Sequence, residues 1–177
     1  YWHSEGAKQD EVFDKNKHLE KFVLASDKGI KLCQIFEDEW RDKREICESM
    51  ILHRLGLDED RCKTWSTKVI ELSAKEQRDF FNFTHISGYV QSKITWGLRD
   101  RKGDIVAALS LRVPRHGKKY DGFLEIARFS TSLKTSVPGG LSKLLKRAKL
   151  WCIENGYKGI MTYVDRRIGD GKGYKLA

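Results

Sequence analysis

The chain has 177 residues, 40% of them hydrophobic and 11% aromatic, a composition that allows one or two folded domains and argues against a disordered chain. Its 34 lysines and arginines outnumber 25 aspartates and glutamates, so the formal net charge is +9 and the isoelectric point is about 9.4. No apolar run approaches the roughly 20 residues of a membrane-spanning helix. The charge therefore favours nucleic acid over a membrane as the partner.

The four cysteines have neither CxxC spacing nor the density of a disulfide scaffold. We predict that they are reduced and mostly buried thiols of a cytosolic protein, with no structural zinc site. They are Cys33, Cys47, Cys62 and Cys152.

The first part of the chain has the pattern of half a βαβ unit in an α/β layer. An amphipathic helix is expected over residues 11–28 and ends at Gly29, and an apolar strand is expected over 30–36. A second helix is expected over 37–56, ending at Gly56. Its inward side chains are expected to be Ile46, Met50, Ile51 and Leu55.

Residues 57–67 are polar and break this periodicity, so we place a boundary there. The second part has the pattern of an antiparallel sheet followed by a glycine turn, a long helix and one more strand. The expected elements are strand 68–72, helix 74–85, strands 93–100 and 104–113 with a hairpin turn at 100–103, strand 123–131, helix 141–156, strand 159–164 and a polar turn 165–175. The helix 141–156 is expected to bury Leu141, Leu144, Leu145, Ala148 and Trp151 on one face.

The stretch SVPGGLS contains Gly139 and Gly140 between a strand and a helix. Backbone N–H groups at such a turn bind phosphate in some proteins, and in others the glycines only make the turn. The helix that follows carries four cations, which suit either a nucleic-acid surface or an ordinary solvated face. They are Lys143, Lys146, Arg147 and Lys149.

A second cluster, Tyr163 to Arg167, lies at the end of a strand, where open α/β sheets place their sites. The alternative is structural, with Asp165 capping a turn and pairing with Arg166. His85, next to a helix end, is expected to be a buried and hydrogen-bonded histidine.

The opening residues, YWHSE, form the third cluster. His3 and Glu5 alternate along a strand and so share one face, while His18 and Lys21 lie one turn apart on the next helix. Cleavage of a phosphodiester with magnesium needs carboxylates for the metal, a base for water and a cation for the phosphate. The alternative is that His3 is a frayed terminal residue.

YWHSE, the helix with His18 and Lys21, GIKLCQIFEDEW and RDKREICESMILHRLG together resemble phage-encoded free-standing homing endonucleases. The nuclease region of that family is similar to the very short patch repair endonuclease, a branch of the PD-(D/E)XK fold. In the family an acidic strand and a Glu-Phe-Asn-Gly-like stretch precede the YWH motif. Neither is present here, so we expect the chain to begin inside the nuclease domain.

HISGYV, KKYDGFLEIARF, SVPGG and TYVDRR resemble the domain that often follows in these phage proteins. That domain is similar to the GCN5-related acyltransferase fold, including the Mom protein. There the glycine turn holds the pyrophosphate of acyl-coenzyme A, which implies Gly139, Gly140 and Ser142 as cofactor-binding residues. SVPGGLS departs from the Arg/Gln-x-x-Gly-x-Gly/Ala form. The family would continue beyond Ala177 into closing strands.

The resemblance implies an α/β (α+β) chain with two domains, a partial restriction-endonuclease-like βαβ layer at 1–58 and an acyltransferase-like mixed sheet with flanking helices at 59–177. We expect a hydrolase of the phage or mobile-element endonuclease class that cleaves double-stranded DNA with Mg²⁺ or Mn²⁺, in the host cytoplasm. The alternatives are an acyl-coenzyme A-dependent transferase acting on DNA or an amine, and a non-catalytic DNA-binding module.

The expected catalytic residues are His3, Glu5, His18 and Lys21, with Glu5 as a metal ligand. The expected DNA-binding residues are Arg115, Lys118, Lys119, Lys143, Lys146, Arg147, Arg166 and Arg167. Because the chain lacks the family's acidic strand, we expect it to bind DNA and to cleave it poorly.

Overall fold

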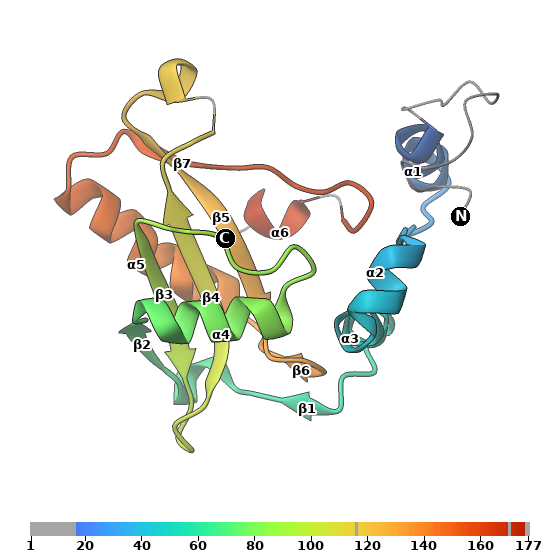
Figure 1. The fold of residues 1–177 in the computed structure, drawn as a ribbon, viewed down its shortest axis with the longest axis horizontal. Helices are drawn as coiled ribbons and strands as arrows, with labels where there is room; N and C mark the ends of the chain where they lie inside the picture. Colours follow the sequence, from blue (N-terminus) through green and yellow to red (C-terminus); the bar gives the residue numbers. More distant parts are fainter. Residues whose placement is uncertain (1–16, 116, 170, 176–177) are drawn as a thin grey trace.

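The computed structural model describes residues 17–115, 117–169 and 171–175, and they form a mixed α and β protein around a five-stranded sheet (Figure 1). The helices are α1 (Lys17–Asp27), α2 (Glu37–Asp42), α3 (Arg44–Leu55), α4 (Ala74–Thr84), α5 (Gly140–Glu154) and α6 (Lys172–Lys175), with 3-10 turns η1 (Thr64–Ser66) and η2 (Gly117–Tyr120). The strands are β1 (Asp60–Arg61), β2 (Lys68–Glu71), β3 (Ile94–Arg99), β4 (Ile105–Arg112), β5 (Phe123–Thr131), β6 (Thr135–Ser136) and β7 (Gly159–Thr162).

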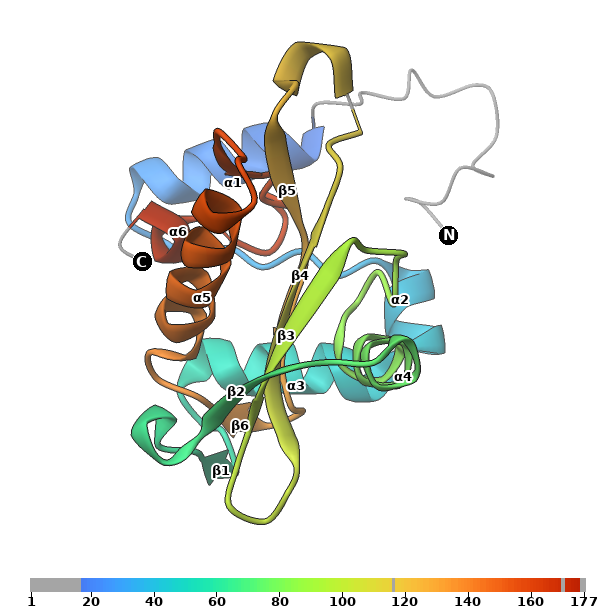
Figure 2. The same ribbon diagram turned by 90° about the vertical axis from the view of Figure 1, so that its left-hand side faces the viewer.

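The main sheet has the strand order β2-β3-β4-β5-β7, and β1 pairs with β6 in a separate two-stranded sheet. Neighbours from β2 to β5 are antiparallel, whereas β5 and β7 are parallel. A parallel pair needs a crossover connection, and α5 provides it. Figure 2 shows the sheet edge-on, with α5 on one face and α4 on the other.

A β-bulge interrupts β5 near its middle. Ser110 of β4 is opposite Arg128, but the next residue, Leu111, is opposite Ile126, so Ala127 has no partner on β4. The parallel pairing with β7 also ends at Ile126, opposite Thr162. Beyond the bulge, β5 therefore pairs with β4 alone among the described strands.

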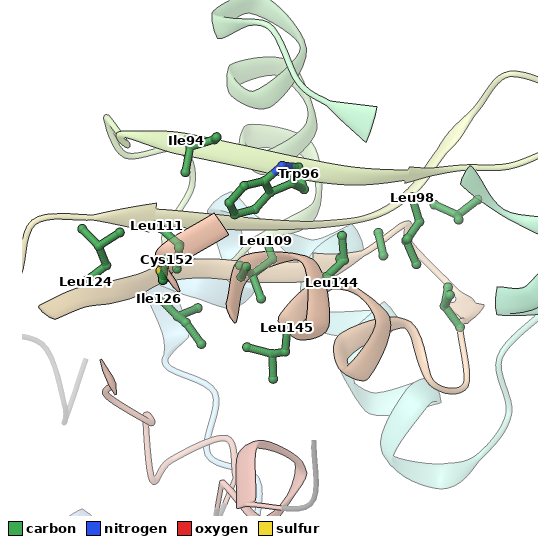
Figure 3. Packing of buried hydrophobic residues seen from close by; sticks show 14 residues of the cluster. Ile94, Trp96, Leu98, Leu109, Leu111, Leu124, Ile126, Leu144, Leu145 and Cys152 are labelled. Carbon is green, nitrogen blue, oxygen red and sulfur yellow. The ribbon is translucent and has the colours of Figure 1, made fainter. Parts of the chain in front are cut away.

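The core lies between the sheet and α5 (Figure 3). Leu144 and Ala148 of α5 have no exposed surface, and neither do Leu109 and Leu111 of β4. Trp96 of β3 is 2% exposed and completes the contact. The face predicted for the long helix is thus confirmed, and its apolar spacing explains why α5 packs on the sheet.

The region before the sheet differs from its prediction in several ways. The helix predicted over 37–56 is two helices, because Lys43 (φ −137°, ψ 43°) leaves helical geometry between α2 and α3. Gly56 ends α3 in the left-handed conformation (φ 72°), as predicted. Ile46 is buried, but Leu55 is 65% exposed and Ile51 36% exposed, so only part of the predicted inward face meets the core.

Residues 30–36 do not form the predicted strand. Among the described residues, the backbone contact that joins this segment to a distant part of the chain is the Gln34 N–H donating to the Arg167 carbonyl (2.8 Å). One such bond makes no ladder, and an apolar run is a strand only where a neighbouring strand pairs with it. Residues 57–67, predicted as polar connection, contain β1 and η1, and the short α6 lies in the predicted polar turn.

Gly97 of β3 is packed closely against Leu72 on the face of the sheet that α4 covers. A Cβ at this buried glycine would lie 2.9 Å from Leu72 Cδ2. We expect Gly97→Ala to lower the free energy of unfolding by about 1–3 kcal/mol, because Leu72 must shift within a packed core. Urea unfolding measures this, and Gly169→Ala is the control, since nothing lies within 4 Å of its Cβ position. Equal free energies of unfolding for Gly97→Ala and Gly169→Ala would contradict the close contact between Gly97 and Leu72.

Candidate functional site

The structure describes two of the four residues predicted for the nuclease site. His18 and Lys21 lie on α1, and His3 and Glu5 lie outside the described residues. His18 Nδ1 is 2.6 Å from Gln34 Oε1, and the Gln34 amide donates to the His18 carbonyl (2.9 Å). The His18 ring also meets Phe36 edge-on. These contacts hold His18 against the 30–36 segment, while Lys21 is exposed.

No group of three or more His, Cys, Asp or Glu side chains suited to a metal ion occurs in the described part of the chain. The predicted ligand Glu5 belongs to the residues that are not described. The four cysteines are free thiols, and burial raises the pKa of Cys47 and of Cys152. Cys33 and Cys62 are only partly buried, so the predicted burial is confirmed for two of the four.

The glycine turn lies at the N-terminus of α5. Gly139 is the N-cap in the left-handed conformation (φ 79°), and as a glycine it has no side chain to cap the helix. Gly140 is buried, and a Cβ on it would lie 3.0 Å from Val137 Cγ1. Ser142 and Gly139 are exposed, so this helix end faces solvent where a phosphate would approach its first N–H groups.

Lys143, predicted to bind DNA, is hydrogen-bonded to the protein itself. Its ammonium donates to the backbone carbonyls of Thr64 (2.9 Å) and Thr67 (2.5 Å), and to Thr67 Oγ1 (3.2 Å). The Thr64 hydroxyl donates in turn to the Pro138 carbonyl. Lys143 therefore fastens η1 to the start of α5.

Two of the other three cations of α5 are exposed, and the third packs against the protein. Lys146 and Lys149 are exposed. Arg147 lies over the Trp96 ring (5.7 Å) and 3.5 Å from a Glu154 oxygen, so its charge is partly satisfied within the protein.

Arg167 joins the end of the chain to α2. Its guanidinium contacts both Glu39 carboxylate oxygens (3.1–3.2 Å) and an Asp165 oxygen at 2.7 Å, and it stacks 4.1 Å from the Phe36 ring centroid. Burial alone would lower the pKa of Arg167, but the bonds to Glu39 and Asp165 raise it. Asp165 pairs with Arg167 rather than with Arg166, the partner in the structural alternative. Arg166 is exposed, over the Phe22 ring.

The basic loop after β4 is held by a buried carboxylate that the sequence did not single out. Glu125, 4% exposed, accepts from the Arg112 guanidinium (2.6 Å) and from the Arg115 backbone N–H (3.1 Å). The Arg115 side chain is left exposed, as is that of Lys119, which lies over Tyr120. The side chain of Lys118 lies outside those described. Glu125 of β5 thus fixes the position of the backbone where this loop begins.

A groove lies beside this loop, lined by Val113, Tyr120, Phe123 and Tyr157 among others. Tyr157 follows the C-terminal end of α5, and the helix of 15 residues is about 22 Å long. The groove and the glycine turn are therefore at opposite ends of α5, and they do not form one site.

His85 is partly buried and hydrogen-bonded, close to its prediction. Its Nδ1 accepts from the Ser87 N–H (3.1 Å), so this nitrogen carries no proton. Burial lowers the pKa of His85 to about 4, and the positive charges of Arg128 and Lys43 add to the effect. Arg128 donates to the carbonyls of Gly88 and Ala127, and so ties this turn to the bulge of β5.

No protein family, no curated protein and no solved structure matches the chain. Of the described helices, none is both long and apolar enough to span a bilayer.

The neutral state of His85 predicts a pH-dependent stability. The unfolded chain binds a proton near the ordinary pKa of 6.5, and the folded chain binds it only near 4. Stability is therefore complete above about pH 6.5 and falls as the pH drops towards 4, with a loss of about 2 kcal/mol between pH 7 and pH 5. Urea unfolding at both pH values measures it.

His85→Asn keeps an acceptor for the Ser87 N–H and removes the titrating ring, so we expect it to lose this part of the pH dependence. His53→Asn is the control, because the His53 side chain is 60% exposed and lies on α3. An unchanged pH profile in His85→Asn would contradict the assignment.

Proposed function

We propose that the chain is a DNA endonuclease of a phage or mobile element, which hydrolyses double-stranded DNA with a divalent metal, and that exposed cations around its sheet hold the duplex. The resemblance of YWHSE and the following helices to free-standing homing endonucleases supports the reaction class. The net charge of +9 supports the partner.

The observation that carries the proposal is a set of exposed cations that have no ion pair with a described carboxylate. Arg115 and Lys119 lie in the loop after β4, Lys146 lies on α5 and Arg166 lies after β7. Lys143 and Arg167 instead satisfy groups of the protein itself. We therefore assign phosphate contacts to the first four residues and remove the other two from the proposed DNA surface.

In the proposed reaction His3 positions or deprotonates water, Glu5 and His18 support the metal or this base, and Lys21 steadies the phosphate. A bound Mg²⁺ or Mn²⁺ would lower the pKa of water and stabilise charge on the phosphate. The exposure of Lys21 leaves its ammonium accessible to a phosphate, and the contacts of His18 with Gln34 fix the position of that ring.

Duplex binding should be strongly salt-dependent, because each phosphate contact releases counterions. We expect Lys146→Gln and Arg166→Gln each to weaken binding and to reduce the slope of log affinity against log salt by about 1. Fluorescence anisotropy with a labelled duplex measures both. Lys75→Gln on α4 is the control, because it removes one exposed charge away from the proposed surface.

Nicking of supercoiled plasmid tests the reaction itself. We expect slow nicking that requires Mg²⁺ or Mn²⁺, stops with a chelator and falls further in His3→Ala. Absence of duplex binding at low salt would refute the DNA surface, and nicking that is equal in His3→Ala would refute the nuclease assignment.

A second function, acyl-coenzyme A-dependent transfer to DNA or an amine, is favoured by one observation. The antiparallel strands β2 to β5, the glycine turn, α5 and the parallel β7 follow the order of the acyltransferase fold that the second part of the chain resembles. The exposed first turn of α5 would hold the cofactor pyrophosphate through the N–H groups near Gly139 and Ser142. Fold alone does not establish this activity.

Calorimetry with acetyl-coenzyme A tests the second function. We expect saturable binding that Gly139→Val reduces at least 10-fold, because a branched side chain is strained at φ 79° and covers the first N–H groups. Gly169→Ala, at an open position, should bind as the parent does. No heat with the parent protein would refute the cofactor.

A further inference from the structure

Trp65 is a large aromatic side chain that the fold holds in solvent. It is the central residue of η1 and is 71% exposed. The other tryptophans of the sheet and α5 are used internally, since Trp96 is 2% exposed and packs edge-on against Trp151. The Trp65 ring is therefore accessible to a partner outside the fold.

The turn that carries Trp65 is fixed on both sides of the ring. Before it, the Thr64 hydroxyl donates to the Pro138 carbonyl, and after it, the Thr67 hydroxyl donates to the Thr64 carbonyl (2.7 Å). The Lys143 ammonium from α5 binds the carbonyls of both threonines. The backbone under Trp65 is therefore preorganised, and a ligand of the ring does not have to order it.

Two cations from different parts of the chain lie over the Trp65 ring. Lys63 Nζ is 5.9 Å and Arg101 Cζ is 5.5 Å from its centroid. Arg101 belongs to the β3–β4 turn, which both Figure 1 and Figure 2 show at the same end of the molecule as β1. The carboxylate of Asp100, also in this turn, accepts from the backbone N–H groups of Lys102 and Asp104.

We propose that Trp65 is a stacking platform for an unpaired base of single-stranded DNA, and that Lys63 and Arg101 hold the phosphates on either side of that base. A largely exposed aromatic ring with two cations close to it complements a nucleotide, which has a flat base and an anionic phosphate. A duplex buries the faces of its bases against one another, so it cannot use the ring in this way. The inference goes beyond duplex binding and does not depend on it.

Trp40 provides a matched comparison within the chain. It is 39% exposed and also has an arginine over its ring, Arg44 at 5.1 Å. That arginine is four residues away in sequence, so neighbouring helical segments bring the pair together locally. At Trp65, Lys63 is likewise a neighbour in sequence, but Arg101 comes from the β3–β4 turn, and Trp65 remains 71% exposed.

The test is anisotropy at low salt with a labelled 12-nucleotide oligo(dT) and with an abasic deoxyribose-phosphate oligomer of the same length. We expect the parent to bind oligo(dT) at least 10-fold more tightly than the abasic oligomer, because stacking on an aromatic ring needs a base. Trp65→Ala should lose this preference and bind both oligomers alike. Trp65→Phe should retain part of it, and Trp40→Ala should retain all of it.

Tryptophan fluorescence gives a second readout on the same complexes. We expect oligo(dT) to quench the parent and Trp40→Phe, and to quench Trp65→Phe much less. The proposal is overturned if Trp65→Ala keeps the preference for oligo(dT), if the parent binds the abasic oligomer as tightly, or if it binds oligo(U) and not oligo(dT). Circular dichroism melting of Trp65→Ala distinguishes lost stacking from lost folding.

Discussion

The packing of α5 against the sheet is the interaction on which the rest of the described structure depends. Leu144 and Ala148 have no exposed surface, and they fix the helix over β3 and β4. Because α5 also connects the parallel strands β5 and β7, its position determines where the segments at its two ends lie. At the first end, Lys143 binds η1 and presents Trp65. The second end leads to β7 and to the loop in which Arg167 reaches Glu39.

Most of the sheet and its two covering helices could be predicted from the sequence, because their signals are local. Apolar spacing identified α5, and the Asp100–Gly103 turn identified the hairpin of β3 and β4. The Ser73–Glu76 capping box, which the structure forms, begins α4 at Ala74. The glycine turn before α5 was also predicted, and Gly139 has the positive φ that only glycine adopts without strain.

The parts that could not be predicted depend on partners far away in the sequence. The apolar run 30–36 has the composition of a strand, but it forms no ladder with the part of the chain that the structure describes. Arg167 and Glu39 are 128 positions apart. The role of Lys143 was hidden for a similar reason, since a lysine on a helix has the same local pattern whether it faces solvent or binds a backbone carbonyl. The sequence shows a tryptophan at position 65 near Lys63 and polar residues. Only the folded structure shows that the Trp65 side chain is exposed.

Charge alone therefore does not locate a nucleic-acid surface in this chain. The two proposed DNA-binding regions, however, lie at opposite ends of β4. The turn with Arg101 precedes β4 and the loop with Arg115 and Lys119 follows it, and a strand of eight residues spans about 27 Å. That length equals about eight base pairs at 3.4 Å each. If both proposals hold, a junction would engage both regions, with duplex DNA at the cations that include Arg115 and Lys119 and an unpaired base at Trp65. A fully paired duplex would then engage only one of the two regions.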